Sequence, residues 1–70
     1  KKINIYPNPV QDDLIILGEY EHANIYDIYG KLILSTESTE KINLSALLSG
    51  IYFIQVSNNN ITITKKVVKK

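Results

Sequence analysis

Short runs of alternating apolar and polar residues recur every eight to twelve residues along this chain, and turn-forming residues separate them. A period of two is the signature of a β-strand with one buried face, because successive side chains point to opposite sides of a strand. The residue types agree with this period, since 26 of the 70 residues are β-branched or aromatic and only two are Ala. Strands at this spacing are typical of a sandwich or barrel and argue against a helical bundle.

Length and composition exclude much chemistry. A chain of 70 residues forms one domain with a thin core. It contains no cysteine and one histidine, which excludes a disulfide framework, a cysteine nucleophile and a multi-histidine metal site. No recognisable motif places a nucleophile near His22, so we interpret it as a surface residue. We therefore expect no enzymatic activity, no cofactor and no metal site.

Charge is distributed unevenly. Six of the eight lysines stand at residues 1–2 and 65–70, while residues 3–64 contain seven acidic residues and two lysines. An acidic body without arginine disfavours nucleic acid as a partner. The basic end has two open interpretations: a solvated edge that prevents strand aggregation, or a recognition element for a partner. No apolar run approaches the length of a transmembrane helix.

Seven short strands are expected. Gly18-Glu19 fits a two-residue hairpin turn, and Asp27 followed by Gly30 fits a type I turn in a second hairpin. Ser57-Asn58-Asn59-Asn60 is expected to form a further turn, because Asn tolerates the left-handed backbone region. The inward side chains are predicted to form one core comprising Ile5, Leu14, Ile16, Ile25, Leu32, Tyr52, Ile54 and Ile63.

The last strand places a lysine on its core side. Continuing the alternation of Ile61 and Ile63 brings Lys65 inward, and a one-residue bulge would bring Lys66 inward instead. Either ammonium must reach the edge of the sheet, because an unpaired buried charge is costly. Residues 65–70 follow the bulk of the core, so their removal is expected to lower stability only modestly.

Two strands carry apolar side chains on both faces. Ile15, Leu17, Ile51 and Phe53 are more apolar than a solvent-facing side requires. One hypothesis is a partly exposed patch that docks to a partner or mediates self-association. The other is that loops or a neighbouring chain cover these residues.

Five motifs in order resemble the C-terminal sorting domain of proteins exported by the type IX, or Por, secretion system of Bacteroidetes. They are Tyr6-Pro7-Asn8-Pro9 with Asp13-Leu14, Ile25-Tyr26-Asp27 with Gly30-Lys31, Leu44 with Leu47, Gly50-Ile51-Tyr52-Phe53, and Lys65-Lys66-Val67-Val68. Together they span nearly the whole chain. The resemblance implies an immunoglobulin-like Greek-key β-sandwich, with residues 1–70 at the end of a larger secreted protein.

The same resemblance implies a function and partners. The domain would direct a cargo protein through the outer-membrane export machinery and then be removed by a sortase-like peptidase upstream of Lys1. The cargo would pass through the periplasm and outer membrane and finish secreted or on the cell surface. Recognition would fall on the tail, which consists of Lys65, Lys66, Val67, Val68, Lys69 and Lys70. The remaining motif residues are expected to be structural, namely Tyr6, Pro7, Asn8, Pro9, Asp27, Gly30, Gly50 and Tyr52.

Two other classes stay open. A carbohydrate-binding or adhesive module of a secreted hydrolase would present a row of exposed aromatics, and Tyr20, Tyr26 and Tyr29 are the candidates. A fibronectin-type spacer would have a purely structural role. The sequence identifies neither the cargo, nor its anchoring, nor the oligomeric state.

Overall fold

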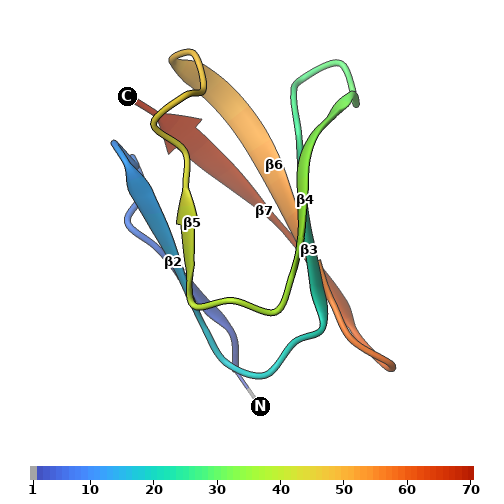
Figure 1. Ribbon diagram of the computed structural model, residues 1–70. Coiled ribbons are helices and arrows are strands. Elements are labelled where there is room, and N and C mark those ends of the chain that lie inside the picture. Colours follow the sequence, from blue (N-terminus) through green and yellow to red (C-terminus); the bar gives the residue numbers. More distant parts are fainter. Residues whose placement is uncertain (1) are drawn as a thin grey trace.

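The computed structural model describes residues 2–70. Of the six terminal lysines, Lys1 lies outside the described residues. Seven strands form two antiparallel sheets packed as a sandwich, which confirms the predicted fold class (Figure 1). The strands are β1 (Asn4–Tyr6), β2 (Asp13–Leu17), β3 (His22–Tyr26), β4 (Leu32–Glu37), β5 (Lys41–Asn43), β6 (Gly50–Ser57) and β7 (Thr62–Lys69). Residues 2–70 contain no helix that is long and apolar enough to span a membrane.

The strand order is β1-β2-β5 in one sheet and β4-β3-β6-β7 in the other. The chain crosses between the sheets after β2, after β4 and after β5, which is the Greek-key connectivity of immunoglobulin-like sandwiches. Tyr52, near the start of β6, donates a hydrogen bond from its hydroxyl to the main-chain oxygen of Leu48 at 2.8 Å. This contact is the tyrosine corner of that fold, in which a strand-borne tyrosine fixes the loop just before its own strand.

The core lies between the two sheets and contains six of the eight residues predicted for it. Leu32 is 50% exposed, so its assignment to the core was wrong. The register between β3 and β4 shifts after Ile25, which pairs with Leu34 while Tyr26 pairs with Leu32. This β-bulge takes Leu32 out of the inward phase of Leu34. Ile63 faces the core opposite Val56 but stays half-buried at the hairpin end.

The predicted hairpin at Gly18-Glu19 was wrong, because β2 and β3 belong to different sheets. Gly18 is needed for another reason. Its φ of 131° lies in the left-handed region, and a Cβ there would stand 2.7 Å from the main-chain oxygen of Lys2. The glycine therefore allows the N-terminal segment to pass close to the end of β2.

The β3–β4 turn is confirmed. The main-chain amide of Gly30 donates to the main-chain oxygen of Asp27 at 3.1 Å, and the Asp27 carboxylate accepts from the amides of Tyr29 and Lys31. The turn at 58–60 forms without the left-handed backbone that was expected, since no non-glycine residue of 2–70 has positive φ. The Asn58 side chain instead accepts from the amides of Asn60 and Ile61.

Candidate functional site

The C-terminal strand β7 carries Lys65, Lys66 and Lys69 on its two faces, and Lys70 follows the strand. Lys65 pairs with buried Ile54, so it points to the core side, and no bulge intervenes. Its ammonium reaches the sandwich edge and donates to the main-chain oxygen of Ile5 at 3.0 Å. The prediction that an inward lysine escapes burial at the edge of the sheet is therefore confirmed.

The four tail lysines have different environments. Lys69 is 7% exposed, and its ammonium donates to the main-chain oxygen of Lys70 at 2.9 Å. Lys66 and Lys70 are exposed, and their ammonium groups have no hydrogen-bond partner among residues 2–70. Lys66 lies on the outer face of the four-stranded sheet, opposite Phe53. Of these four lysines, Lys66 and Lys70 thus offer a free positive charge to a partner.

The segment after β1 fixes the outer edge of β7. The Asn8 side chain donates from Nδ2 to the main-chain oxygen of Lys66 and accepts on Oδ1 from the amide of Val68, both at 2.9 Å. The amide of Val10 donates to the main-chain oxygen of Val68, and the amide of Lys70 donates to that of Val10, both at 2.8 Å. We call residues 8–10 and 66–70 with these four hydrogen bonds the terminal clasp.

The terminal clasp gives the motif Tyr6-Pro7-Asn8-Pro9 a structural role, which is to lead the chain from β1 to the edge of β7. β1 is an edge strand of the three-stranded sheet, and the two prolines that follow it end the strand. The chain then runs to the edge of the other sheet, where Val10 forms a parallel bridge with Lys69. Sequence reasoning missed this pairing with β7. The sequence signal for this pairing was Asn8 between two prolines. An amide side chain both donates and accepts, so it can bind the main-chain groups at a strand edge where no neighbouring strand does so.

The four residues predicted as one docking patch lie on two separate surfaces. Ile15 and Leu17 face outward from β2 in the three-stranded sheet, whereas Ile51 and Phe53 face outward from β6 in the four-stranded sheet. The sandwich core separates the two pairs, so the structure does not bring them together. Ile51 is exposed and the other three are half-buried.

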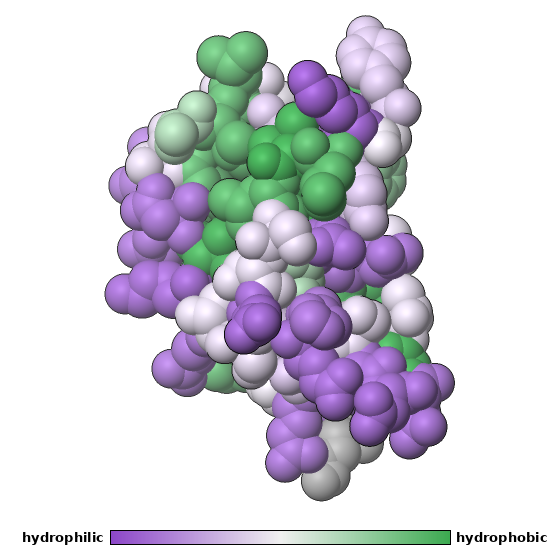
Figure 2. All heavy atoms as spheres, turned by 45° about the vertical axis from the view of Figure 1, so that its right-hand side comes forward, coloured by the Kyte–Doolittle hydropathy of each residue, from purple (hydrophilic) through white to green (hydrophobic). Residues whose placement is uncertain are grey.

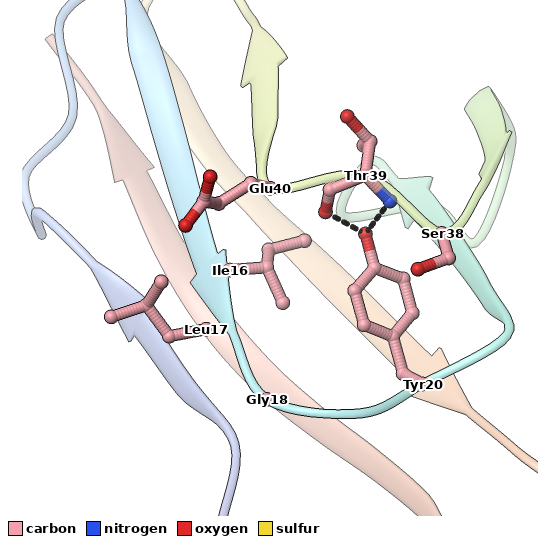
Figure 3. Close-up of a pocket in the computed structure, with 7 residues that line it drawn as sticks. All are labelled: Ile16, Leu17, Gly18, Tyr20, Ser38, Thr39 and Glu40. Atoms are coloured by element: carbon pink, nitrogen blue, oxygen red, sulfur yellow. Dashed lines mark hydrogen bonds between the residues drawn. The ribbon is translucent and has the colours of Figure 1, made fainter.

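A hollow of about 230 Å³ lies where the β2–β3 and β4–β5 connections meet (Figure 3). Tyr20 points into it, and its hydroxyl donates to the main-chain oxygen of Thr39 and accepts from the Thr39 amide at 2.7 Å. No histidine, cysteine or lysine lines this hollow. Within residues 2–70 there is also no cluster of three His, Cys, Asp or Glu side chains that could hold a metal ion. The hollow supplies no argument for a reaction.

The proposed row of sugar-stacking aromatics does not form. Tyr20 is buried and tied to Thr39, and Tyr26 is half-buried on β3 with its hydroxyl accepting a hydrogen bond from Asn24 at 3.3 Å. Tyr29 alone is nearly fully exposed, in the β3–β4 turn. The carbohydrate-binding alternative therefore has no support, because the three tyrosines lie on different elements and only Tyr29 is exposed.

Residues 4–70 match the model of a protein family described as the secretion system C-terminal sorting domain. The match covers essentially the whole chain and confirms the resemblance carried by its five motifs. No curated protein matches the sequence.

Proposed function

Because this chain belongs to the family of type IX secretion system C-terminal sorting domains, we propose that it takes a cargo protein across the outer membrane as a non-catalytic signal. The family implies export to the cell surface or beyond, and contact with the secretion machinery. The proposed route leads through the periplasm. A sortase-like peptidase then removes the domain from its cargo.

One observation supports a specific recognition element: two of the four tail lysines bind main-chain oxygens with their ammonium groups, and the other two leave theirs exposed. The proposed contact is made by Lys66 on β7 and by Lys70 directly after it, whose charges are exposed on a segment that the four hydrogen bonds of the terminal clasp hold in place. A fixed backbone lowers the entropy lost on binding, so a receptor with acidic groups gains affinity from these two charges. Lys65 and Lys69, whose ammonium groups bind main-chain oxygens, then have a structural role.

The test is a reporter fused to the N-terminus of the domain in a host with a working type IX system. The double variant Lys66→Ser, Lys70→Ser is compared with Lys31→Ser, Lys41→Ser, which removes the same charge from exposed lysines outside the tail. Loss of two exposed charge contacts of roughly 0.5–1 kcal/mol each predicts export lower by about tenfold in the tail variant. The control variant is expected to be exported normally.

Thermal unfolding of each isolated domain separates recognition from folding. Both double variants are surface changes, so their stability should stay within about 0.5 kcal/mol of the parent domain. Normal export of a well-folded Lys66→Ser, Lys70→Ser variant would refute the role of these two charges. An equal loss in the control would assign the effect to net charge instead.

A further inference from the structure

The outward side chains of the four-stranded sheet form rows that run across its strands. Two adjacent rows on β3, β6 and β7 lie on the side of the sheet that faces away from the core. Ile25 and Ile54, which lie between these rows in the chain, are buried on the opposite side. We call these two rows the outer face; they consist of Tyr26, Phe53 and Lys66, and of Asn24, Gln55 and Thr64.

The centre of the outer face is aromatic and uncharged. Tyr26 and Phe53 are half-buried and lie opposite each other on neighbouring strands. Lys66, opposite Phe53 on β7, is the only charged residue of the six. The cores of protein–protein interfaces are enriched in aromatic residues and depleted of charged ones, which lie at the rim instead. The outer face therefore has the composition of a protein-binding surface.

Hydrogen bonds fix one part of the outer face and leave another part unused. Asn24 donates from Nδ2 to the hydroxyl of Tyr26 at 3.3 Å and accepts on Oδ1 from the hydroxyl of Ser35 at 2.7 Å. The neighbouring amide side chain of Gln55 is half-buried and makes no hydrogen bond within residues 2–70. The Tyr26 ring is thus already ordered, which lowers the entropy lost on binding, and the Gln55 amide is available to a partner.

The exposed apolar residues at one end of the sandwich are a separate surface. Figure 2 shows hydrophobic residues concentrated in the upper part of the molecule, and the β3–β4 turn and the β5–β6 loop stand at the top in Figure 1. Tyr29 and Leu48 project there from two different loops. The aspartates and lysines at this end offset one another, so their charges indicate no partner. The outer face differs because it adjoins Lys66, for which a receptor is proposed above.

The two tail charges are too small a contact for a specific complex. Together they contribute about tenfold to affinity, whereas specific protein interfaces bury about 800 Å² on each partner. A receptor that binds Lys66 must therefore cover surface beside it. Residues 8–10 occupy the outer edge of β7 next to Lys66, so the open surface is on the other side, towards Phe53. β6 lies only about 4.8 Å from β7.

We propose that the receptor of the tail lysines lies on the outer face, with Phe53 and Tyr26 at the centre of the contact and Lys66 at its rim. The receptor surface is then apolar at its centre, with an acidic group opposite Lys66 and a hydrogen-bonding group opposite Gln55. This inference rests on the proposed function, because the export machinery supplies the receptor. It also separates the two surfaces considered for docking, since Ile15 on the other sheet lies outside the contact.

The first test compares Phe53→Ala with Ile15→Ala in the reporter fusion. Both side chains are half-buried and face outward, but from different sheets. Truncation of an aromatic residue at the centre of an interface typically lowers affinity by tenfold or more, so export of Phe53→Ala should fall by at least about tenfold. Ile15→Ala should be exported normally. Equal losses in the two variants would assign the effect to stability and overturn the inference.

The second test uses a variant that leaves the fold intact. Gln55→Ala removes no hydrogen bond within residues 2–70, and neither does Asn4→Ala, which changes an exposed amide on the other sheet. Loss of one hydrogen bond to the receptor should lower export by about threefold to tenfold in Gln55→Ala. Asn4→Ala is its control and should be exported normally. Thermal unfolding of each isolated domain should show that both variants fold like the parent.

The results distinguish this inference from the proposed function. If Lys66→Ser, Lys70→Ser lowers export while Phe53→Ala and Gln55→Ala are exported normally, the tail contact stands and the outer face has no part in it. Normal export of all three well-folded variants would refute the tail contact itself. Sedimentation of the isolated domain tests the other occupant of this surface. A dimer that Phe53→Ala abolishes would mean that the outer face joins two copies of the chain and that its assignment to the receptor is wrong.

Discussion

Replacement of Asn8 by alanine tests whether the terminal clasp holds the recognition strand. In the structure one amide side chain satisfies two main-chain groups on the outer edge of β7, the oxygen of Lys66 and the amide of Val68. Alanine removes both hydrogen bonds and leaves the two flanking prolines in place. The change therefore isolates the side-chain contacts from the shape of the turn.

The expected loss follows from these two bonds. A typical intramolecular hydrogen bond contributes about 0.5–1.5 kcal/mol net, and exposed partners can bind water instead, which favours the lower part of that range. The predicted loss for Asn8→Ala is then about 1–2 kcal/mol. For a domain of this size each kcal/mol lowers Tm by roughly 4–8 °C, so a fall of about 5–15 °C is expected. A small domain holds only a few kcal/mol in total, which makes this loss substantial.

The assay combines thermal unfolding with amide hydrogen exchange. The Val68 amide, which loses its acceptor, should exchange much faster in Asn8→Ala, whereas the Ile54 amide in the centre of β6 should change only with global stability. Asn59→Ala is the matched control, because Asn59 is exposed and its side chain makes no hydrogen bond within residues 2–70. If Asn8→Ala unfolds at the same temperature as Asn59→Ala and Val68 stays protected, the clasp does not stabilise β7.

Two further changes probe the frame around this strand by urea denaturation. Gly18→Ala should lose about 3 kcal/mol, because alanine is strained at this φ and its Cβ would meet the oxygen of Lys2; Gly30→Ala, with open space around it, should lose only about 1–2 kcal/mol. A reversed order would contradict this account. Tyr20→Phe should lose about 1–3 kcal/mol, because both main-chain groups of Thr39 lose their partner. An unchanged denaturation midpoint would show that water replaces the hydroxyl there.

The sequence predicted the strands well because their period of two was strong. Ile54 alternates with Phe53 and Gln55, and the structure places Ile54 at 0% exposure with its neighbours on the outer face. The same counting gave the correct face for Lys65. Leu32 failed because a bulge shifts the phase by one residue, and the alternation itself contains no sign of the extra residue in the pairing of β3 with β4.

Alternation assigns a side chain to a face but not to a sheet. Ile15 and Phe53 carry the same outward signal, yet they lie on opposite sides of the molecule. Whether the chain after β2 forms a hairpin or crosses to the other sheet decides in which sheet each later strand lies. Gly18 suggested the hairpin because glycine suits a tight turn, whereas here it accommodates a main-chain contact with Lys2. Long-range contacts of this kind leave only an ambiguous local signature.

The terminal clasp also changes how the tail should be studied. A modest cost was expected for removing residues 65–70, but Val67 is 2% exposed and pairs with Tyr52 in the core. Truncation would also remove the strand to which Asn8 and Val10 bind, and so would release the segment between β1 and β2. Lost export after truncation would therefore follow from unfolding as readily as from lost recognition. Substitution of Lys66 and Lys70 avoids this, since their ammonium groups bind nothing within residues 2–70 and their main chain still forms the clasp.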